Sequence, residues 1–154
     1  MDIKDSGARS RNMAAIKSRD TAPEMRLRSA IWRKGMRFFT PAGWQRLAGE
    51  RLTGSPDLIF PSARVVLFVD GCFWHGCPSH YRAPDSRAEF WRDKLDENRQ
   101  RDSVVNGELS GCGWRVIRLW EHQLTVKRLP AAVQQVATVL QQVRESKSGS
   151  YGQK

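Results

Sequence analysis

Two acidic residues border apolar stretches that can form one edge of a sheet. Asp57 comes directly before the apolar residues 58–60, and Asp70 directly after the largely apolar run 64–69. If a tight turn joins these runs as a hairpin, Asp57 lies nearly opposite Phe68, and the two-residue period of a strand puts Asp70 on the same face. Carboxylates so placed repel each other unless a divalent cation or another positive partner lies between them, and oxygen ligands suit Mg²⁺. We therefore expect a magnesium site that acts on a phosphodiester.

Two further polar residues occupy positions where the local pattern calls for apolar ones. Asn98 and Asp102 lie on the apolar stripe of a predicted long helix. One alternative is that they face a solvated edge of the stripe or bond to neighbouring backbone. The other is that Asp102 belongs with Asp57 and Asp70, and the presence of these two carboxylates favours it. Glu24, at the start of an earlier helix, is a candidate for the same site, although a capping-box hydrogen bond also accounts for it.

Cysteines and histidines gather in the string DGCFWHGCPSH. Cys72, Cys77 and His80 have a spacing found in metal sites, and His122 could supply a fourth ligand from beyond the last predicted strand. Four nitrogen and sulfur ligands without a carboxylate predict a closed, structural Zn²⁺ site. The alternative is that both cysteines are small buried hydrophobic residues. For Cys112, which has no such neighbours, we expect burial.

The same string contains one more histidine and two adjacent aromatics. His75 is not needed for the zinc set; beside a magnesium site it would serve as general base or acid, and the alternative is a surface or zinc-binding histidine. Phe73 and Trp74 stand in a glycine-flanked turn and cannot both enter one core. One or both could wedge between stacked bases, whereas the alternative puts one of them in the core. For Trp91 the same two alternatives apply, a wedge between bases or a place in the core.

The elements that must position these residues are readable from caps, turns and periodicity. Helices and strands alternate, which predicts an α/β fold with a mixed central sheet flanked by helices. The expected elements are a helix at 22–34, a long turn or irregular hairpin at 40–55, strands at 58–60 and 64–69, a helix from a capping box at 86–89 to residue 111, a strand at 114–120 and a helix from 130.

The charge of the chain narrows the class of partner. Lysine and arginine number 26 against 16 aspartates and glutamates, giving a formal net charge of +10. Such an excess favours nucleic acid, with a membrane surface as a weaker second. No apolar run approaches the roughly 20 residues that span a bilayer, and no signal peptide is evident, so the cytoplasm is the expected compartment. We expect a DNA-contacting arm or short helix at 1–20, one domain at 21–145 and a disordered tail at 146–154.

Several strings, in their order and spacing, resemble the very short patch repair endonucleases. They are RSRNM-x-AI, SRDTAPE, the Pro-Asp pair ending at Asp57, FVDGCFWHGCP, EFWRDKLDENRQRD and GWRVIRLWE, within residues 9–125. The resemblance implies a restriction-endonuclease-like fold with a structural zinc site. It implies a DNA endonuclease that nicks one strand 5′ of the thymine in a T·G mismatch, formed by deamination of 5-methylcytosine, and leaves a 5′-phosphate to start very short patch repair.

Residue by residue, the resemblance also implies an active site. Asp57 and the backbone carbonyl of Val69 would bind Mg²⁺, and His75 would transfer a proton to or from the attacking water with the support of Asp102. Glu24 matches an active-site glutamate of the family.

Further matches concern base stacking, zinc and one open role. The residues that match wedging or intercalating residues of the family are Phe73, Trp74, Trp91 and Met13. His122 stands where some members have cysteine. Asp70 stands where some members have histidine, and the lysine of the usual nuclease pattern is absent, so the role of Asp70 stays open between metal ligand and supporting acid.

Two other functions remain open at this point. One is a nuclease of the same fold with another DNA target, and the other is a zinc-stabilised DNA-binding module without catalysis. The second requires the placements of Asp57, Asp70 and Asp102 to be accidental. A cut in one strand of an asymmetric lesion fits a monomer, and other mismatch-repair proteins are candidate partners.

Overall fold

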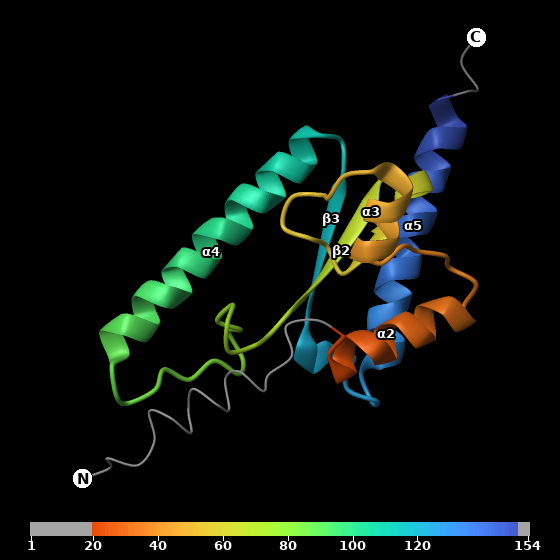
Figure 1. The fold of residues 1–154 in the computed structure, drawn as a ribbon. Coiled ribbons are helices and arrows are strands. Elements are labelled where there is room, and N and C mark those ends of the chain that lie inside the picture. The colour runs from red at the N-terminus through yellow and green to blue at the C-terminus, as the bar shows by residue number, and fades with distance from the viewer. Residues whose placement is uncertain (1–19, 151–154) are drawn as a thin grey trace.

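The computed structural model describes residues 20–150, so Met13 and nearly all of the expected N-terminal arm lie outside it. Helices and strands alternate along the described chain (Figure 1). The elements are α2 (Ala22–Arg33), α3 (Pro41–Ala48), β1 (Leu58–Phe60), β2 (Val65–Asp70), α4 (Ala88–Gly111), β3 (Arg115–Trp120) and α5 (Leu129–Ser150), with short 3-10 helices at Pro61–Ala63 and Glu121–Leu124.

The strands form one sheet in the order β1-β2-β3, and the sheet is mixed, as the sequence predicted. The strand β2 is antiparallel to β1 and parallel to β3. Leu58 pairs with Leu67, so the register brings the preceding residue, Asp57, beside Phe68 as expected for the hairpin. Because β2 and β3 run parallel, their C-terminal ends lie side by side, and Asp70 pairs with Trp120.

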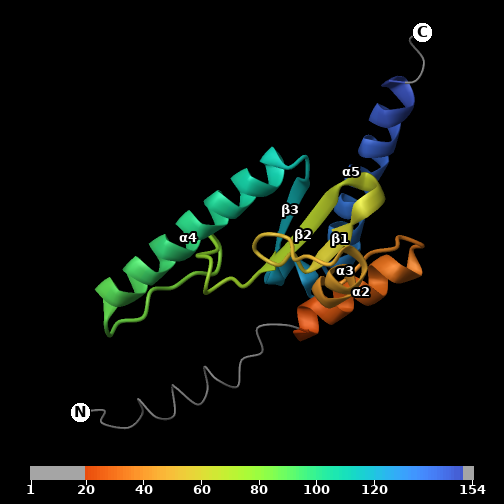
Figure 2. The same ribbon diagram turned by 45° about the horizontal axis from the view of Figure 1, so that its top comes forward.

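Helices cover both faces of the sheet, and each face has its own apolar core (Figure 2). Val65 and Leu67 of β2 pack with α2 and α5, whereas Val66 and Phe68 pack with α4. This alternation explains why β2 is apolar throughout, since a strand buried on both faces has no polar side. Among residues 20–150, no helix combines the length and the apolar character needed to cross a bilayer.

The helix α3 corrects the expectation of a turn or hairpin at 40–55. Thr40 accepts a hydrogen bond from the backbone N–H of Gly43 at 3.2 Å, and a proline occupies the first turn. Gly49, with φ of 78°, ends the helix in the left-handed conformation that glycine adopts without strain. These start and stop signals are present in the sequence, but the density of glycine and proline around them favoured a loop.

The start of α4 also differs from the expectation. The helix begins at Ala88, and Arg87 occupies the N-cap with φ of 59° and without a side-chain capping bond. The helix therefore begins one residue later than a cap at Ser86 would put it, and the long helix itself is confirmed.

The end of α5 corrects the expected tail. The helix continues to Ser150, so residues 146–150 are helical rather than disordered, while 151–154 lie outside the description. The hydroxyl groups of Ser146 and Ser148 donate to carbonyls one turn earlier in the helix. Lys147 ties this last part of α5 to the hairpin turn by donating to the carbonyl of Ser62 at 2.6 Å.

Candidate active site

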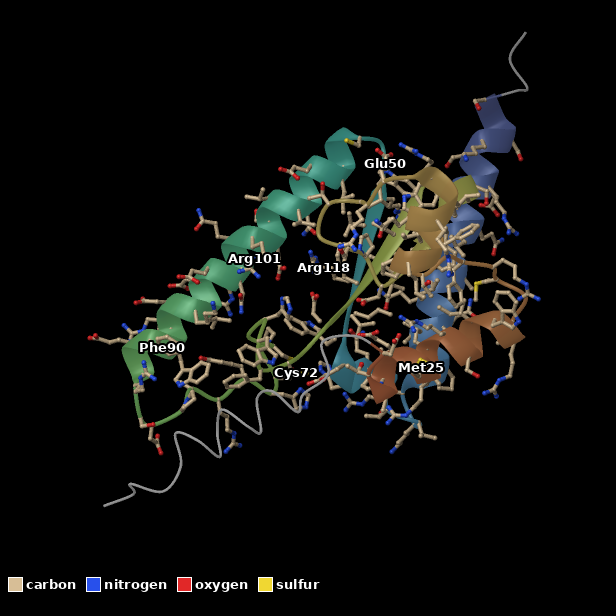
Figure 3. The ribbon with its side chains drawn as sticks, in the orientation of Figure 1. Met25, Glu50, Cys72, Phe90, Arg101 and Arg118 are labelled. Carbon is tan, nitrogen blue, oxygen red and sulfur yellow. The ribbon has the colours of Figure 1, made fainter. Side chains whose placement is uncertain are left out.

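A pocket of about 590 Å³ opens where α2, the end of β2 and α4 approach one another. Six residues that the sequence singled out line it: Glu24, Asp57, Val69, Asp70, His75 and Asp102. Three arginines line it as well, namely Arg28, Arg101 and Arg118. Figure 3 shows Arg101 on α4 and Arg118 on β3, two elements that contribute to the lining of the pocket. The fold thus brings together acids that lie far apart in the sequence and adds cations that the sequence reading had not assigned to the site.

Asp57 is held against the end of β2. Its carboxylate accepts a hydrogen bond from the backbone N–H of Val69 at 2.7 Å. Burial raises the pKa of Asp57 to about 7, and the nearby Glu24 adds to the rise, while the bond from Val69 opposes it. A buried carboxylate with too little positive charge around it fits the position of a bound divalent cation, which would remove this penalty.

Glu24 lies in the cap of α2 and also lines the pocket. It is 5% exposed and lines the pocket, and its backbone N–H donates to the hydroxyl of Thr21 at 3.4 Å. Its carboxylate accepts from the backbone N–H of Asp20 at 3.0 Å and from Arg28 at 3.4 Å. Burial raises the pKa of Glu24, and Arg28 opposes the rise. The cap of α2 therefore holds this acid in place at the rim of the pocket.

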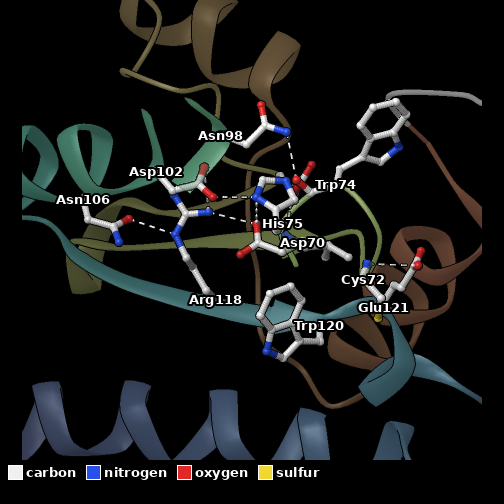
Figure 4. A network of polar contacts seen from close by, with 12 residues as sticks. Asp70, Cys72, Trp74, His75, Asn98, Asp102, Asn106, Arg118, Trp120 and Glu121 are labelled. Atoms are coloured by element: carbon white, nitrogen blue, oxygen red, sulfur yellow. Dashed lines mark hydrogen bonds and ion pairs between the residues drawn. The ribbon is translucent and has the colours of Figure 1, made fainter. Parts of the chain in front are cut away.

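His75 and Asp102 form a close pair across the pocket (Figure 4). The Nδ1 atom of His75 lies 2.5 Å from Oδ2 of Asp102, on α4. The other nearby carboxylate, Asp70, is 4.0 Å from the same nitrogen. Asp102, on the apolar stripe of α4, thus lines the pocket together with the other acids and contacts an imidazole.

Asp70 is engaged by an arginine that the sequence reading had not singled out as a site residue. Nη1 of Arg118 donates to Oδ1 of Asp70 at 2.8 Å and lies 3.7 Å from Oδ1 of Asp102. Burial raises the pKa of Asp70, while His75 and Arg118 oppose the rise. One feature could have pointed to Arg118 as a site residue, since it stands between two buried residues of β3. A cation in the middle of such a strand requires a partner.

The aromatic residues pack on one another beside the pocket and belong to neither core cluster. Ring centroids of Phe73 lie 5.2 Å from Trp74 and 5.4 Å from Trp91. Two further rings that the sequence reading missed extend this aromatic cluster, Tyr81 against Phe73 and Phe90 against Trp91. All but Phe90, which is exposed, are half-buried, so the cluster presents ring surface to the outside.

Asn98 links the aromatic cluster to α4. Its side-chain amide donates to the carbonyl of Trp74 at 2.8 Å, a bond drawn in Figure 4. This polar residue of the apolar stripe therefore bonds to neighbouring backbone, which is one of the alternatives considered for it. The bond orders the backbone directly before His75.

Cys72, Cys77, His80 and His122 come together at the other side of the same loop, with their ligand atoms all within 4.8 Å of one another. Sulfur to nitrogen distances are 3.3 Å for Cys72 with His122, 3.5 Å for Cys77 with His122 and 3.6 Å for Cys77 with His80. Tetrahedral zinc, with bonds of about 2.3 Å to sulfur and about 2.0 Å to nitrogen, separates such ligands by roughly 3.5 Å. The four residues therefore fit a tetrahedral metal ion, and His122 is the fourth member.

The surroundings of this group suit a structural metal. Both cysteines are buried, and the backbone N–H of Cys72 donates to Glu121 at 3.1 Å. Burial lowers the pKa of the His122 imidazole, which favours the neutral form that binds a metal, and raises the pKa of the Cys72 thiol, a penalty on the thiolate that a bound cation would remove. Cys112, by contrast, is exposed, which corrects the expectation of burial. It follows the last turn of α4, and its backbone bonds hold it at the surface.

Comparison with known proteins decides the family. The model of the family described as DNA mismatch endonuclease Vsr matches residues 1–81. The type II nicking enzyme V.NaeI of Lentzea aerocolonigenes is 43% identical over 115 residues, which cover 75% of this chain and 68% of that protein. The DNA mismatch endonuclease Vsr of Escherichia coli K12 is 39% identical over 121 residues, covering 78% and 73%. The chain belongs to the Vsr family.

Membership of the Vsr family makes this protein an endonuclease that acts on DNA. The pocket around Asp57 and His75 is the candidate for its active site, because its lining gathers carboxylates, a histidine and three arginines.

Proposed function

We propose that the protein nicks one strand of duplex DNA on the 5′ side of the thymine in a T·G mismatch, in a Mg²⁺-dependent reaction that leaves a 5′-phosphate. The observation that carries the proposal is the pocket in which Asp57 and the paired His75 and Asp102 face the same space. The mixed sheet with helices on both faces supports the restriction-endonuclease-like fold for this site.

The chain's own groups suit phosphodiester hydrolysis. Asp57, together with the backbone carbonyl of Val69, would hold Mg²⁺, which when bound polarises the phosphate and acidifies water. With Nδ1 protonated, His75 donates a hydrogen bond to Asp102, which fixes the orientation of the imidazole and leaves Nε2 to accept a proton. Asp102 then stabilises the imidazolium that forms, so the pair acts as an oriented general base.

The positive charge of the protein supports binding to the phosphate backbone. Arg28, Arg101 and Arg118 line the pocket within a chain of net charge +10. Contacts of this kind provide affinity that does not depend on sequence and that weakens as salt rises.

The aromatic cluster of Phe73, Trp74, Tyr81, Phe90 and Trp91 supports recognition of the mismatch. Half-buried rings beside a nuclease pocket suit wedging between bases, and a weak base pair costs less to unstack than a matched one. Met13, which lies outside the described residues, is proposed to intercalate as well. A cut in one strand at one lesion needs a single pocket, so we propose that a monomer acts, with other mismatch-repair proteins as later partners.

We further propose that the group of Cys72, Cys77, His80 and His122 holds a structural Zn²⁺. A donor set of two sulfurs and two nitrogens with no carboxylate matches closed zinc sites, and it leaves no position open for substrate. The ion would fix the loop that carries His75 and two rings of the aromatic cluster, Phe73 and Trp74.

The test is a nicking assay on end-labelled duplexes that differ only in T·G or C·G at one position, with Mg²⁺ present or absent. We expect a Mg²⁺-dependent nick 5′ of the mismatched thymine. In Asp57→Asn the nicking rate should fall by about a thousandfold while DNA affinity changes by less than about threefold. Asp96→Asn, on an exposed position of α4, is the matched control and should nick normally.

Each contrary result points to one alternative function. Equal cutting of both duplexes would indicate a nuclease with another DNA target. Tight binding without Mg²⁺-dependent cutting by the wild type would indicate a DNA-binding module without catalysis. Equal loss of binding and cutting in Asp57→Asn would remove Asp57 from the magnesium site.

A further inference from the structure

Three residues in the pocket are arranged like the ligands of a second metal ion. The ligand atoms of Asp70, His75 and Asp102 all lie within 4.8 Å of one another. A cation is already present among them, because Arg118 lies 2.8 Å from Oδ1 of Asp70 and 3.7 Å from Oδ1 of Asp102. The two carboxylates thus share one guanidinium group of the protein itself (Figure 4).

The guanidinium group of Arg118 is held on several sides. Its Nε donates to Oδ1 of Asn106 on α4 at 2.9 Å, and its plane lies over the ring of Phe68, 4.3 Å from the centroid. The side chain is 20% exposed. A planar group fixed by hydrogen bonds and by a ring has few alternative positions, so its charge stays at one place in the pocket.

The position of this charge determines which acid pairs with His75. Nδ1 of His75 has two carboxylates within reach, Asp102 at 2.5 Å and Asp70 at 4.0 Å. The oxygen of Asp70 that faces His75 is Oδ1, the same atom that accepts from Arg118. Without the guanidinium group, Asp70 would be an uncompensated buried charge, and the imidazole would be its nearest available donor.

We propose that Arg118 is a positioning residue for the reaction. Its guanidinium group forms an ion pair with Asp70, so that Asp102 remains the partner of His75. The same group occupies the place that a second metal ion would take. This inference rests on the proposed function. It assigns Asp70 as the counterion of Arg118 rather than as a magnesium ligand. Arg118 therefore acts on the orientation of the imidazole and needs no contact with the substrate for this role.

The first test separates positioning from phosphate binding. Single-turnover nicking rates and DNA dissociation constants are measured for Arg118→Gln, Asp70→Asn and the double variant. We expect Arg118→Gln to lower the rate about a hundredfold with affinity within about threefold, because a misplaced imidazole is lost as a base. The double variant should recover to within about tenfold of wild type, since removing the Asp70 charge removes the competitor for His75. Arg118→Lys should stay slow, because a point charge cannot engage Asn106 and both acids together.

The matched control is Arg115→Gln. Arg115 is an exposed arginine on the same strand that donates to Gln142, so the variant loses the same charge away from the pocket. Its nicking rate at saturating DNA should not change. A double variant no faster than Arg118→Gln, or a loss of affinity without a loss of rate in Arg118→Gln, would overturn the proposal.

The second test does not depend on activity. In protein with ¹⁵N-labelled histidine, the Nδ1 proton of His75 bonded to Asp102 should give a shifted, slowly exchanging NMR signal, assigned by its loss in Asp102→Asn. The signal should move or disappear in Arg118→Gln and return in the double variant. An unchanged signal in folded Arg118→Gln refutes the proposal. If the wild type nicks no duplex, the proposed function fails, and this measurement still decides the role of Arg118.

Discussion

The carboxylate of Asp57 and the backbone N–H of Val69 are joined by a hydrogen bond of 2.7 Å that ties the start of β1 to the end of β2. The bond alone does not compensate for burial, which raises the pKa of Asp57 to about 7. The folded protein therefore binds a proton at this position more tightly than the unfolded chain. Stability from this group is greatest below about pH 4 and is lost as the pH rises through about 7.

The first prediction follows from the direction of this pKa shift. In zinc-loaded protein without Mg²⁺, Asp57→Asn should have a larger free energy of unfolding than the wild type at pH 8. At pH 5 this difference in free energy of unfolding should be smaller by on the order of 3 kcal/mol. The amide keeps the acceptor for Val69 but has no charge to bury. Urea unfolding at both pH values measures this, and Mg²⁺ added at pH 8 should stabilise only the wild type. If the difference in free energy of unfolding between the two proteins does not depend on pH, burial does not raise the pKa of Asp57.

The second prediction concerns the cysteine and histidine group. Cys77→Ser should reduce bound zinc, measured by elemental analysis per chain, and lower the melting temperature by about 10 °C or more, because a structural ion contributes its binding energy to folding. Cys112→Ser is the matched control, since Cys112 is exposed and lies outside the group. Full zinc content in Cys77→Ser would show that this residue is not a ligand.

The third prediction concerns the aromatic cluster. Trp74→Ala should lower the ratio of nicking rates on mismatched and matched duplexes about tenfold while nonspecific affinity stays within about threefold. Trp32→Ala is the control, because Trp32 is 51% exposed but packs against Phe38, outside the aromatic cluster. A fluorescent base analogue beside the mismatch should report unstacking with the wild type and less with Trp74→Ala. Unchanged discrimination would exclude the wedge.

The fourth prediction concerns the residue between His75 and Cys77. Gly76 has φ of 66°, and an added Cβ would lie 2.6 Å from Leu95 and 2.8 Å from Arg99. Gly76→Ala should therefore cost about 2 kcal/mol in urea unfolding and slow nicking about tenfold by shifting His75. Gly107→Ala, in open space on α4, should instead stabilise by up to about 1 kcal/mol. Wild-type stability and rate in Gly76→Ala would show that the loop is not rigid.

Sequence reasoning predicted the hairpin register, the mixed sheet and the gathering of the acids, because the period of a strand and short turns constrain them directly. It also predicted that Cys72, Cys77, His80 and His122 come together, since three of them lie in one short string. Sequence reasoning missed α3, because the many glycines and prolines around its caps favoured a loop. It also missed the contact of Arg118 with the site. The partners of Arg118 depend on how α4 lies across the sheet, and no local pattern encodes that crossing.

The site draws its parts from both ends of the described chain, since Glu24 lies on α2 while Arg118 and His122 come from β3 and the turn after it. Proteins are synthesised from the N-terminus. A nascent chain on the ribosome therefore carries the acids and the aromatic rings before it has Arg118 or His122. The pocket is completed only after β3 has been synthesised.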